Sequence, residues 1–150
     1  MNGQQLDQYN FEIFSENNFL EKTISLMDES VVIFENPTGK EMHGVDGYIR
    51  YLAEVVNIIP DLKSRVIEHQ LYEDKVMSRL QMRGSFTGTL QTMEGIFFGN
   101  GNPIDIEYQI EQQLNPAGKV GRLIFNYDLP DFIHQLSRRY RPIMPSQAET

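Results

Sequence analysis

Apolar residues in the first part of the chain recur every three or four positions, which is the spacing of one face of an α-helix. Three such stripes run over residues 6–14, 20–27 and 45–59. Asn18 precedes the second stripe as a capping residue would, and Pro60 ends the third. The pattern predicts three helices, of which the third is the longest.

Runs of β-branched, aromatic or alternating residues predict five strands. Their ranges are 31–34, 63–72, 75–86, 104–114 and 120–127. The last strand leads into Asp128 and then into a short closing helix that begins near Pro130. Residues 37–44 have loop composition, and so do the glycine-rich residues 87–103, apart from a short extended piece at 96–98.

The order of these elements, with helices first and antiparallel strands after them, is typical of an α+β domain. We expect N-terminal helices packed on one face of a strongly curved, mostly antiparallel sheet. This arrangement leaves a cone-shaped cavity of the kind that small ligands use. Because no linker or internal repeat divides the chain, residues 1–141 are predicted to form one domain and residues 142–150 a flexible tail.

The composition excludes several classes of function. The 150 residues carry a formal net charge of -8, which does not suit sequence-independent binding of nucleic acid, because that binding needs Lys and Arg to neutralise phosphates. The chain has no cysteine, so it has no disulfide, thiolate metal site or cysteine nucleophile. It shows neither an apolar run long enough to span a membrane nor a secretory leader, so we expect a cytoplasmic protein without membrane contact.

Five segments carry a resemblance to a known family. They are FLEKTISLMDESVVIFENP (19–37), GVDGYIRYL (44–52), IPDL (59–62), GSFTG (84–88) and NPAGKVGRLIFNYDLPDFIHQL (115–136). In order and spacing they resemble the SnoaL-like polyketide cyclase and ester cyclase family. This family belongs to the superfamily with the cone-shaped fold of ketosteroid isomerase, scytalone dehydratase and nuclear transport factor two. The resemblance implies an enzyme without a cofactor that acts on a small apolar carbonyl compound.

Asp128 is the leading candidate for catalysis, because a carboxyl group at a strand end can be held at the mouth of a pocket that the sheet lines. The resemblance implies the same residue, since cyclases of this family use an aspartate at the end of the last long strand as general acid or base. A buried acid could remove a proton beside a carbonyl and return it, as an aldol cyclisation or an isomerisation requires. The alternative role is structural, because an acid ahead of Leu129 and Pro130 can accept backbone N–H bonds at the start of a helix.

Six further residues are candidates for binding the substrate. They are Asn126, His43, His69, Tyr9, Tyr108 and Phe86. Asn126 shares the strand face of Asp128, and either histidine is a candidate proton-transfer partner of that acid. Each residue has a structural alternative as a solvent-facing amide, a surface histidine or a core aromatic ring. Neither histidine has a partner at a metal-ligand spacing, so no metal site is expected.

Two functions follow from these observations. The first is a small-molecule cyclase or isomerase that uses Asp128 for proton transfer in a closed pocket. The alternative is a non-catalytic domain of the same fold that binds a hydrophobic ligand or a partner protein. The polar strand face of Glu107, Gln109 and Glu111 is compatible with solvent or with a homodimer through the sheet face.

Overall fold

The computed structural model describes residues 24–93 and 95–138. The first predicted helix, residues 20–23 of the second, Tyr9 and the predicted tail lie outside these residues. Met27, which the sequence pattern assigns to the end of the second helix, is instead the first residue of a strand.

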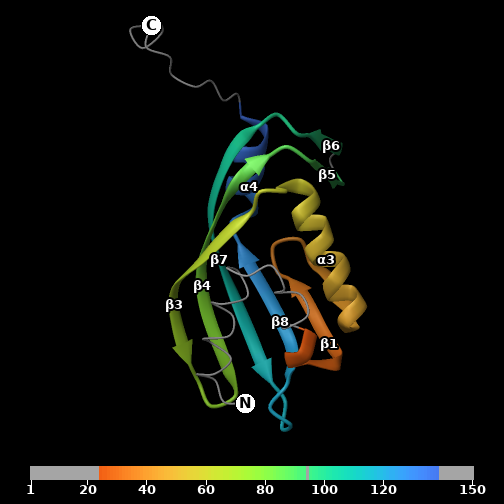
Figure 1. The fold of residues 1–150 in the computed structure, drawn as a ribbon, viewed down its shortest axis with the longest axis vertical. Helices are drawn as coiled ribbons and strands as arrows, with labels where there is room; N and C mark the ends of the chain where they lie inside the picture. The colour runs from red at the N-terminus through yellow and green to blue at the C-terminus, as the bar shows by residue number, and fades with distance from the viewer. Residues whose placement is uncertain (1–23, 94, 139–150) are drawn as a thin grey trace, which may run out of the picture.

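A six-stranded sheet is the framework of the protein (Figure 1). Its order is β2-β1-β8-β7-β4-β3, and all neighbours are antiparallel except β1 and β8, which are parallel. The strands are β1 (Met27–Glu35), β2 (Lys40–His43), β3 (Lys63–Leu71), β4 (Lys75–Phe86), β7 (Asn102–Leu114) and β8 (Val120–Tyr127). The predicted mostly antiparallel sheet is therefore confirmed.

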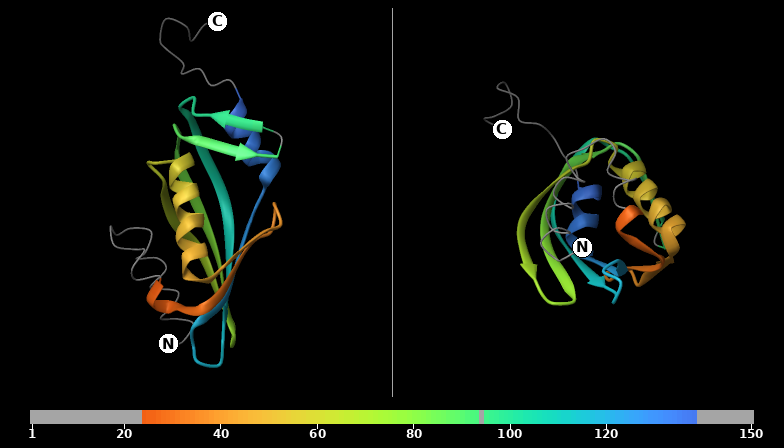
Figure 2. Two further views of the ribbon diagram at one scale, coloured as in Figure 1. Left: turned by 90° about the vertical axis from the view of Figure 1, so that its right-hand side faces the viewer. Right: turned by 60° about the horizontal axis from the view of Figure 1, so that its bottom comes forward.

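The sheet is strongly curved, and two helices lie on its concave side (Figure 2). Helix α3 (Gly44–Ile58) packs against β1, and helix α4 (Leu129–Ser137) packs against β7. Both helices have one apolar face, and that face is turned toward the sheet: α3 buries Tyr48 and Tyr51, and α4 buries Phe132 and Leu136. The predicted α+β class and cone-shaped architecture are confirmed.

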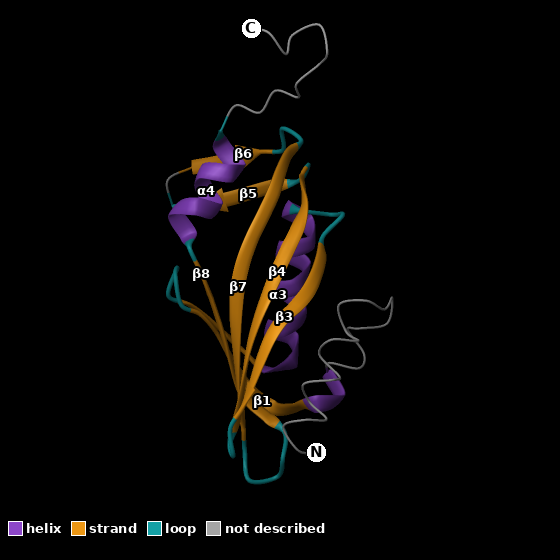
Figure 3. Ribbon diagram, turned by 90° about the vertical axis from the view of Figure 1, so that its left-hand side faces the viewer, coloured by secondary structure: helices purple, strands orange, loops and turns teal. Residues whose placement is uncertain are grey.

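Two segments predicted to be loops contain strands (Figure 3). Residues 37–44 include β2, which turns back from β1 and pairs with it from Glu35–Lys40 to Val32–His43. Residues 87–103 include the hairpin of β5 (Thr89–Thr92) and β6 (Gly95–Phe98), and β6 confirms the extended piece that the sequence predicts at 96–98. Each of these strands has four residues, which is too short for an alternating pattern to show in the sequence.

Asn102, at the start of β7, fastens α4 to the sheet. Asn102 is 3% exposed. Its side-chain Nδ2 donates hydrogen bonds to the backbone oxygens of Gln135 at 3.0 Å, Leu136 at 3.2 Å and Arg138 at 2.6 Å. These carbonyls belong to the last turn of α4, where the helix offers them no backbone donor. The amide of Asn102 therefore serves as a C-terminal cap that comes from another element.

Replacing Asn102 by Asp should lower the free energy of unfolding by about 2–3 kcal/mol, because a buried carboxyl would face three carbonyl oxygens without the donor they need. Denaturant unfolding measures this effect. The matched control is Asn126→Asp, where the amide is exposed and accepts a hydrogen bond that a carboxylate can also accept. Equal stabilities of the two variants would contradict the capping role.

Candidate active site

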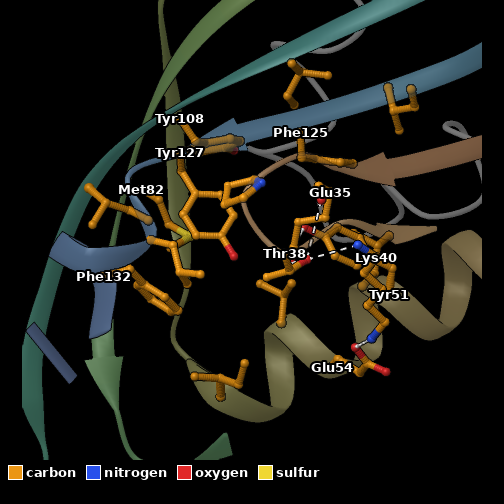
Figure 4. Close-up of a pocket in the computed structure, with 18 of the residues that line it drawn as sticks. Glu35, Thr38, Lys40, Tyr51, Glu54, Met82, Tyr108, Phe125, Tyr127 and Phe132 are labelled. Atoms are coloured by element: carbon orange, nitrogen blue, oxygen red, sulfur yellow. Dashed lines mark hydrogen bonds and ion pairs between the residues drawn. The ribbon is translucent and has the colours of Figure 1, made fainter. Parts of the chain in front are cut away.

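The concave side of the sheet encloses a cavity of about 960 Å³ (Figure 4). Inward-facing residues of β1, β4, β7 and β8 form one wall, α3 and α4 contribute two more, and the β5–β6 hairpin borders one end. Most of the lining side chains are aliphatic or aromatic, such as Leu52, Met82, Ile110, Phe125 and Phe132. The cavity has the size and the apolar character of small-molecule sites.

Glu35 brings a carboxylate into this apolar wall. Strand β1 alternates so that Val31, Ile33 and Glu35 face inward, and Glu35 is 9% exposed. Its Oε2 accepts a hydrogen bond from the Tyr51 hydroxyl at 2.5 Å, and its Oε1 accepts one from the Thr38 hydroxyl at 2.7 Å. Figure 4 shows the three side chains converging at the cavity wall. A buried acid held in place by two hydrogen-bond donors can serve in proton transfer to and from a bound molecule.

Three tyrosines around the cavity keep their protons over a wide pH range. Burial, and then the charge of Glu35 and the hydrogen bond to it, raise the pKa of Tyr51 well above its ordinary value. Burial, followed by the charge of Glu35, also raises the pKa of Tyr127. Burial raises the pKa of Tyr108, whose hydroxyl donates to Ser64 Oγ at 3.0 Å. These hydroxyls therefore act at neutral pH as hydrogen-bond donors and not as proton sources.

Alkaline titration should separate these tyrosines from the exposed ones. Since the folded-state pKa of each lies above the unfolded value of about 10, the protonated form stabilises the fold below that pH, and this stabilisation is lost as the pH rises through the folded-state pKa. We expect the tyrosinate absorbance to show a delayed class that ionises together with unfolding. The variant Tyr51→Phe should make this class smaller. Ionisation of every tyrosine near pH ~10 in folded protein would contradict the burial.

Asp128 does not reach the cavity. The residue is exposed and is absent from the cavity lining, and its Oδ1 accepts a hydrogen bond from the backbone N–H of Asp131 at 3.0 Å. It is the N-cap of α4, with Pro130 in the first turn. The expectation that this carboxyl is shielded inside the pocket is therefore wrong. The reason is the alternation of side chains along β8. Tyr127 points into the cavity, so its neighbours Asn126 and Asp128 point outward.

Most of the other predicted site residues also lie away from the cavity. Asn126 is exposed and accepts a hydrogen bond from Asn36 Nδ2, and His43 is exposed beside Glu41. His69 lies 3.0 Å from Ser78, measured from Nδ1 to Oγ, and does not line the cavity. Phe86 is fully buried in the core. Tyr108 is the predicted residue that the structure does place in the cavity lining.

The central residue that the sequence pattern missed is Glu35. The predicted strand ends at Phe34, one residue before this acid, whereas β1 includes Glu35. The signal was present in the alternation of Val31 and Ile33, because its next inward position is residue 35. Tyr51 could not be joined to Glu35 without the packing of α3 on β1, whereas Thr38 reaches Glu35 locally, in the turn between β1 and β2.

Residues 24–93 and 95–138 contain neither a metal-binding cluster nor a membrane-spanning helix. No group of three or more Asp, Glu or His side chains there is placed to hold a metal ion. No helix in the same part of the chain is long and apolar enough to cross a membrane.

A curved sheet closed by helices over an apolar cavity, with the buried acid Glu35 in its wall, is the arrangement of the ketosteroid isomerase-like fold. Residues 5–119 match the SnoaL-like polyketide cyclase family, and the chain belongs to that family. The matched segment contains Glu35 and Tyr51 and ends before Asp128. No curated protein matches the chain in sequence.

Solved structures share this fold at low sequence identity. A candidate SnoaL-like polyketide cyclase from Jannaschia sp. CCS1 is 15% identical with a TM-score of 0.75, and the similarity covers 90% of each chain. AclR, a candidate hydroxylase from Streptomyces galilaeus, is 16% identical with a TM-score of 0.71, over 98% of this chain and 89% of AclR. A candidate polyketide cyclase from Xanthomonas campestris is 18% identical with a TM-score of 0.70, over 90% of this chain and 96% of the other. At these identities the likeness shows the fold.

Proposed function

We propose that the protein is a cyclase or isomerase that needs no cofactor, binds an apolar carbonyl compound in the cavity and uses Glu35 as its general base and acid. The observation that carries the proposal is the Glu35 carboxylate, buried in an apolar cavity wall and oriented by Tyr51 and Thr38. Membership of the SnoaL-like polyketide cyclase family supports the reaction class.

The proposed chemistry begins with removal of a proton from the carbon next to a carbonyl group. Glu35 takes this proton, and the electron pair of the broken C–H bond forms an enolate. The neutral hydroxyl of Tyr127, whose pKa is raised by burial and by Glu35, is the group proposed to donate a hydrogen bond to the enolate oxygen. In an isomerisation, Glu35 returns the proton to another carbon. In a cyclisation, the enolate carbon attacks a second carbonyl, and the new alkoxide takes up the proton.

Exchange of hydrogen for deuterium tests this first step without knowledge of the natural substrate. The wild-type protein in D2O is incubated with a panel of apolar cyclic ketones, and NMR measures deuterium beside the carbonyl. We expect exchange faster than in buffer for the ketones that bind. Ketones that bind tightly and show no faster exchange would contradict the enzymatic role and favour the non-catalytic binding domain.

A homodimer through the outer face of the sheet is a further part of the proposal. That face carries paired charges: Arg79 contacts both Glu68 and Glu107, and Arg83 contacts Asp105. Charges that are already paired are compatible with a polar, hydrated interface between two copies. Light scattering of wild type and Arg79→Glu tests this assembly, since loss of the pairing should shift a dimer toward monomer. The cytoplasm is the proposed location of the protein.

A further inference from the structure

Gln112 carries a buried side-chain amide that has no partner in the part of the chain that the structure describes. It lies on the inward face of β7, is 4% exposed and lines the cavity. Among residues 24–93 and 95–138, no hydrogen bond or ion pair satisfies its side chain, in contrast to the buried amide of Asn102. A buried amide without a partner destabilises the folded protein, because it gives up its hydrogen bonds to water and gains none.

The neighbours of Gln112 give it no structural task. Across the sheet it is paired with Val76 on β4 and with Leu123 on β8, both buried and apolar. Leucine at this position would continue the apolar wall. The amide is therefore best explained by a group that is present only when the cavity is occupied.

The strand pairing places Gln112 and Glu35 well apart on the inner face of the sheet. Glu35 is opposite Phe125, which is opposite Ile110, and Gln112 is the next inward residue after Ile110. Two strand spacings and one two-residue step place the two Cα atoms roughly 12 Å apart. Gln112 lies toward the β7–β8 turn, whereas the β5–β6 hairpin and α4 border the other end of the cavity. A ligand whose reacting carbon is at Glu35 therefore extends toward Gln112 through an apolar stretch.

The charges around the cavity limit what Gln112 can bind. Among the described lining residues Lys40 is the one cation, and its Nζ is paired with Glu54 Oε2 at 2.5 Å. An anionic group at Gln112 would be buried without a counter-charge, which is strongly unfavourable. A side-chain amide can instead donate to a carbonyl oxygen or exchange hydrogen bonds with a hydroxyl.

We propose that Gln112 is a specificity-determining residue that binds a second, uncharged oxygen function of the ligand, a hydroxyl or a carbonyl, at the far side of its apolar body from Glu35. This inference rests on the proposed function, because it assumes that the cavity is the ligand site. It assigns the ligand to the class of apolar compounds with oxygen functions at both ends.

Binding of 2-naphthol and 2,6-dihydroxynaphthalene tests this inference, since the two differ only in the second hydroxyl. Naphthol fluorescence reports the Kd values, and the chain has no tryptophan to interfere. We expect the wild type to bind the diol about 5–10-fold more tightly. Gln112→Leu should abolish this difference and keep the affinity for 2-naphthol. Gln109→Leu, on the outer face of the same strand, should keep the difference.

A second measurement separates a ligand-binding role from a structural one. If Gln112 has no structural task, Gln112→Leu should raise the Tm by roughly 2–4 °C, whereas loss of a structural hydrogen bond would lower it. In the wild type, the side-chain amide resonances of Gln112, assigned by their loss in Gln112→Leu, should shift with the diol and stay in place with 2-naphthol.

The outcomes of this test are independent of catalysis. If the preference for the diol depends on Gln112 while no ketone is exchanged, the specificity role stands and the enzymatic proposal falls. Equal affinity of the wild type for both naphthols, or a preference that survives in Gln112→Leu, would overturn the role of Gln112 and leave the Glu35 proposal untouched.

Discussion

Replacing Glu35 by Gln is expected to lower the rate of ketone deuterium exchange by about 10²–10⁴-fold, the usual contribution of a positioned general base. Glutamine has nearly the same shape, and its amide oxygen can accept from one of the Tyr51 and Thr38 hydroxyls while its amide N–H donates to the other, so the cavity should persist. It cannot take up the proton, however. We therefore expect ketone affinity to stay within a few-fold of wild type while the exchange rate collapses, and NMR measures both quantities.

The control for this variant is Asp128→Asn. Asparagine is also a good N-cap, so α4 should be retained, and the exchange rate should equal that of the wild type. This pair of variants compares the acid inside the cavity with the acid that the sequence pattern favoured. If Asp128→Asn lost exchange and Glu35→Gln kept it, the assignment of the base to Glu35 would be refuted.

Replacing Gly88 by Ala should cause the largest loss of stability, about 3 kcal/mol in the free energy of unfolding. A Cβ at this position would overlap with the backbone carbonyl of Asn57 at the end of α3. The Gly88 N–H also donates to the carbonyl oxygen of Ile58 at 3.1 Å. Because this contact joins backbone to backbone, no side-chain rotation can relieve the overlap. Denaturant unfolding gives the value.

Gly121→Ala is the matched control for Gly88→Ala. A Cβ at Gly121 would lie 3.7 Å from the Cβ of Asn115, an ordinary contact distance. We expect its stability to stay within about 0.5 kcal/mol of wild type. The Gly88 variant should also bind ketones more weakly, because Gly88 leads into the hairpin whose Leu90 and Met93 line the cavity. A Gly88→Ala protein as stable as the control would show that this close approach is unimportant.

The long elements of the fold were predictable from the sequence because their pattern is local. Strand β7 alternates through Ile104, Ile106, Tyr108 and Ile110, and α3 has a wide apolar face that ends before Pro60. Strand β2 was not predictable, since its existence depends on hydrogen bonds to β1 and not on its own residues. In the β5–β6 hairpin, the extended piece predicted at 96–98 is confirmed as β6, whereas its partner β5 was not predictable for the same reason.

The site was less predictable than the fold, because it depends on which way side chains point. Asp128 was predicted first as a catalytic acid and only alternatively as an acceptor at the start of the closing helix, and the structure shows the second role, because Asp128 points outward and caps α4. Glu35 is separated from Tyr51 by 16 residues and meets it through the packing of α3 on β1. Gln112 continues the inward face of β7, yet only its burial, with no hydrogen-bond partner among the described residues, distinguishes it from a surface amide.

The most direct test of the central claim is a crystal structure of the Glu35→Gln variant with the ketone that the wild type exchanges fastest. We expect the ketone inside the cavity, with the carbon beside its carbonyl in contact with the side chain of residue 35. Tyr51 should still be hydrogen-bonded to that side chain. A ketone bound beside Asp128, or on the outer surface of the sheet with the cavity unfilled, would contradict the claim.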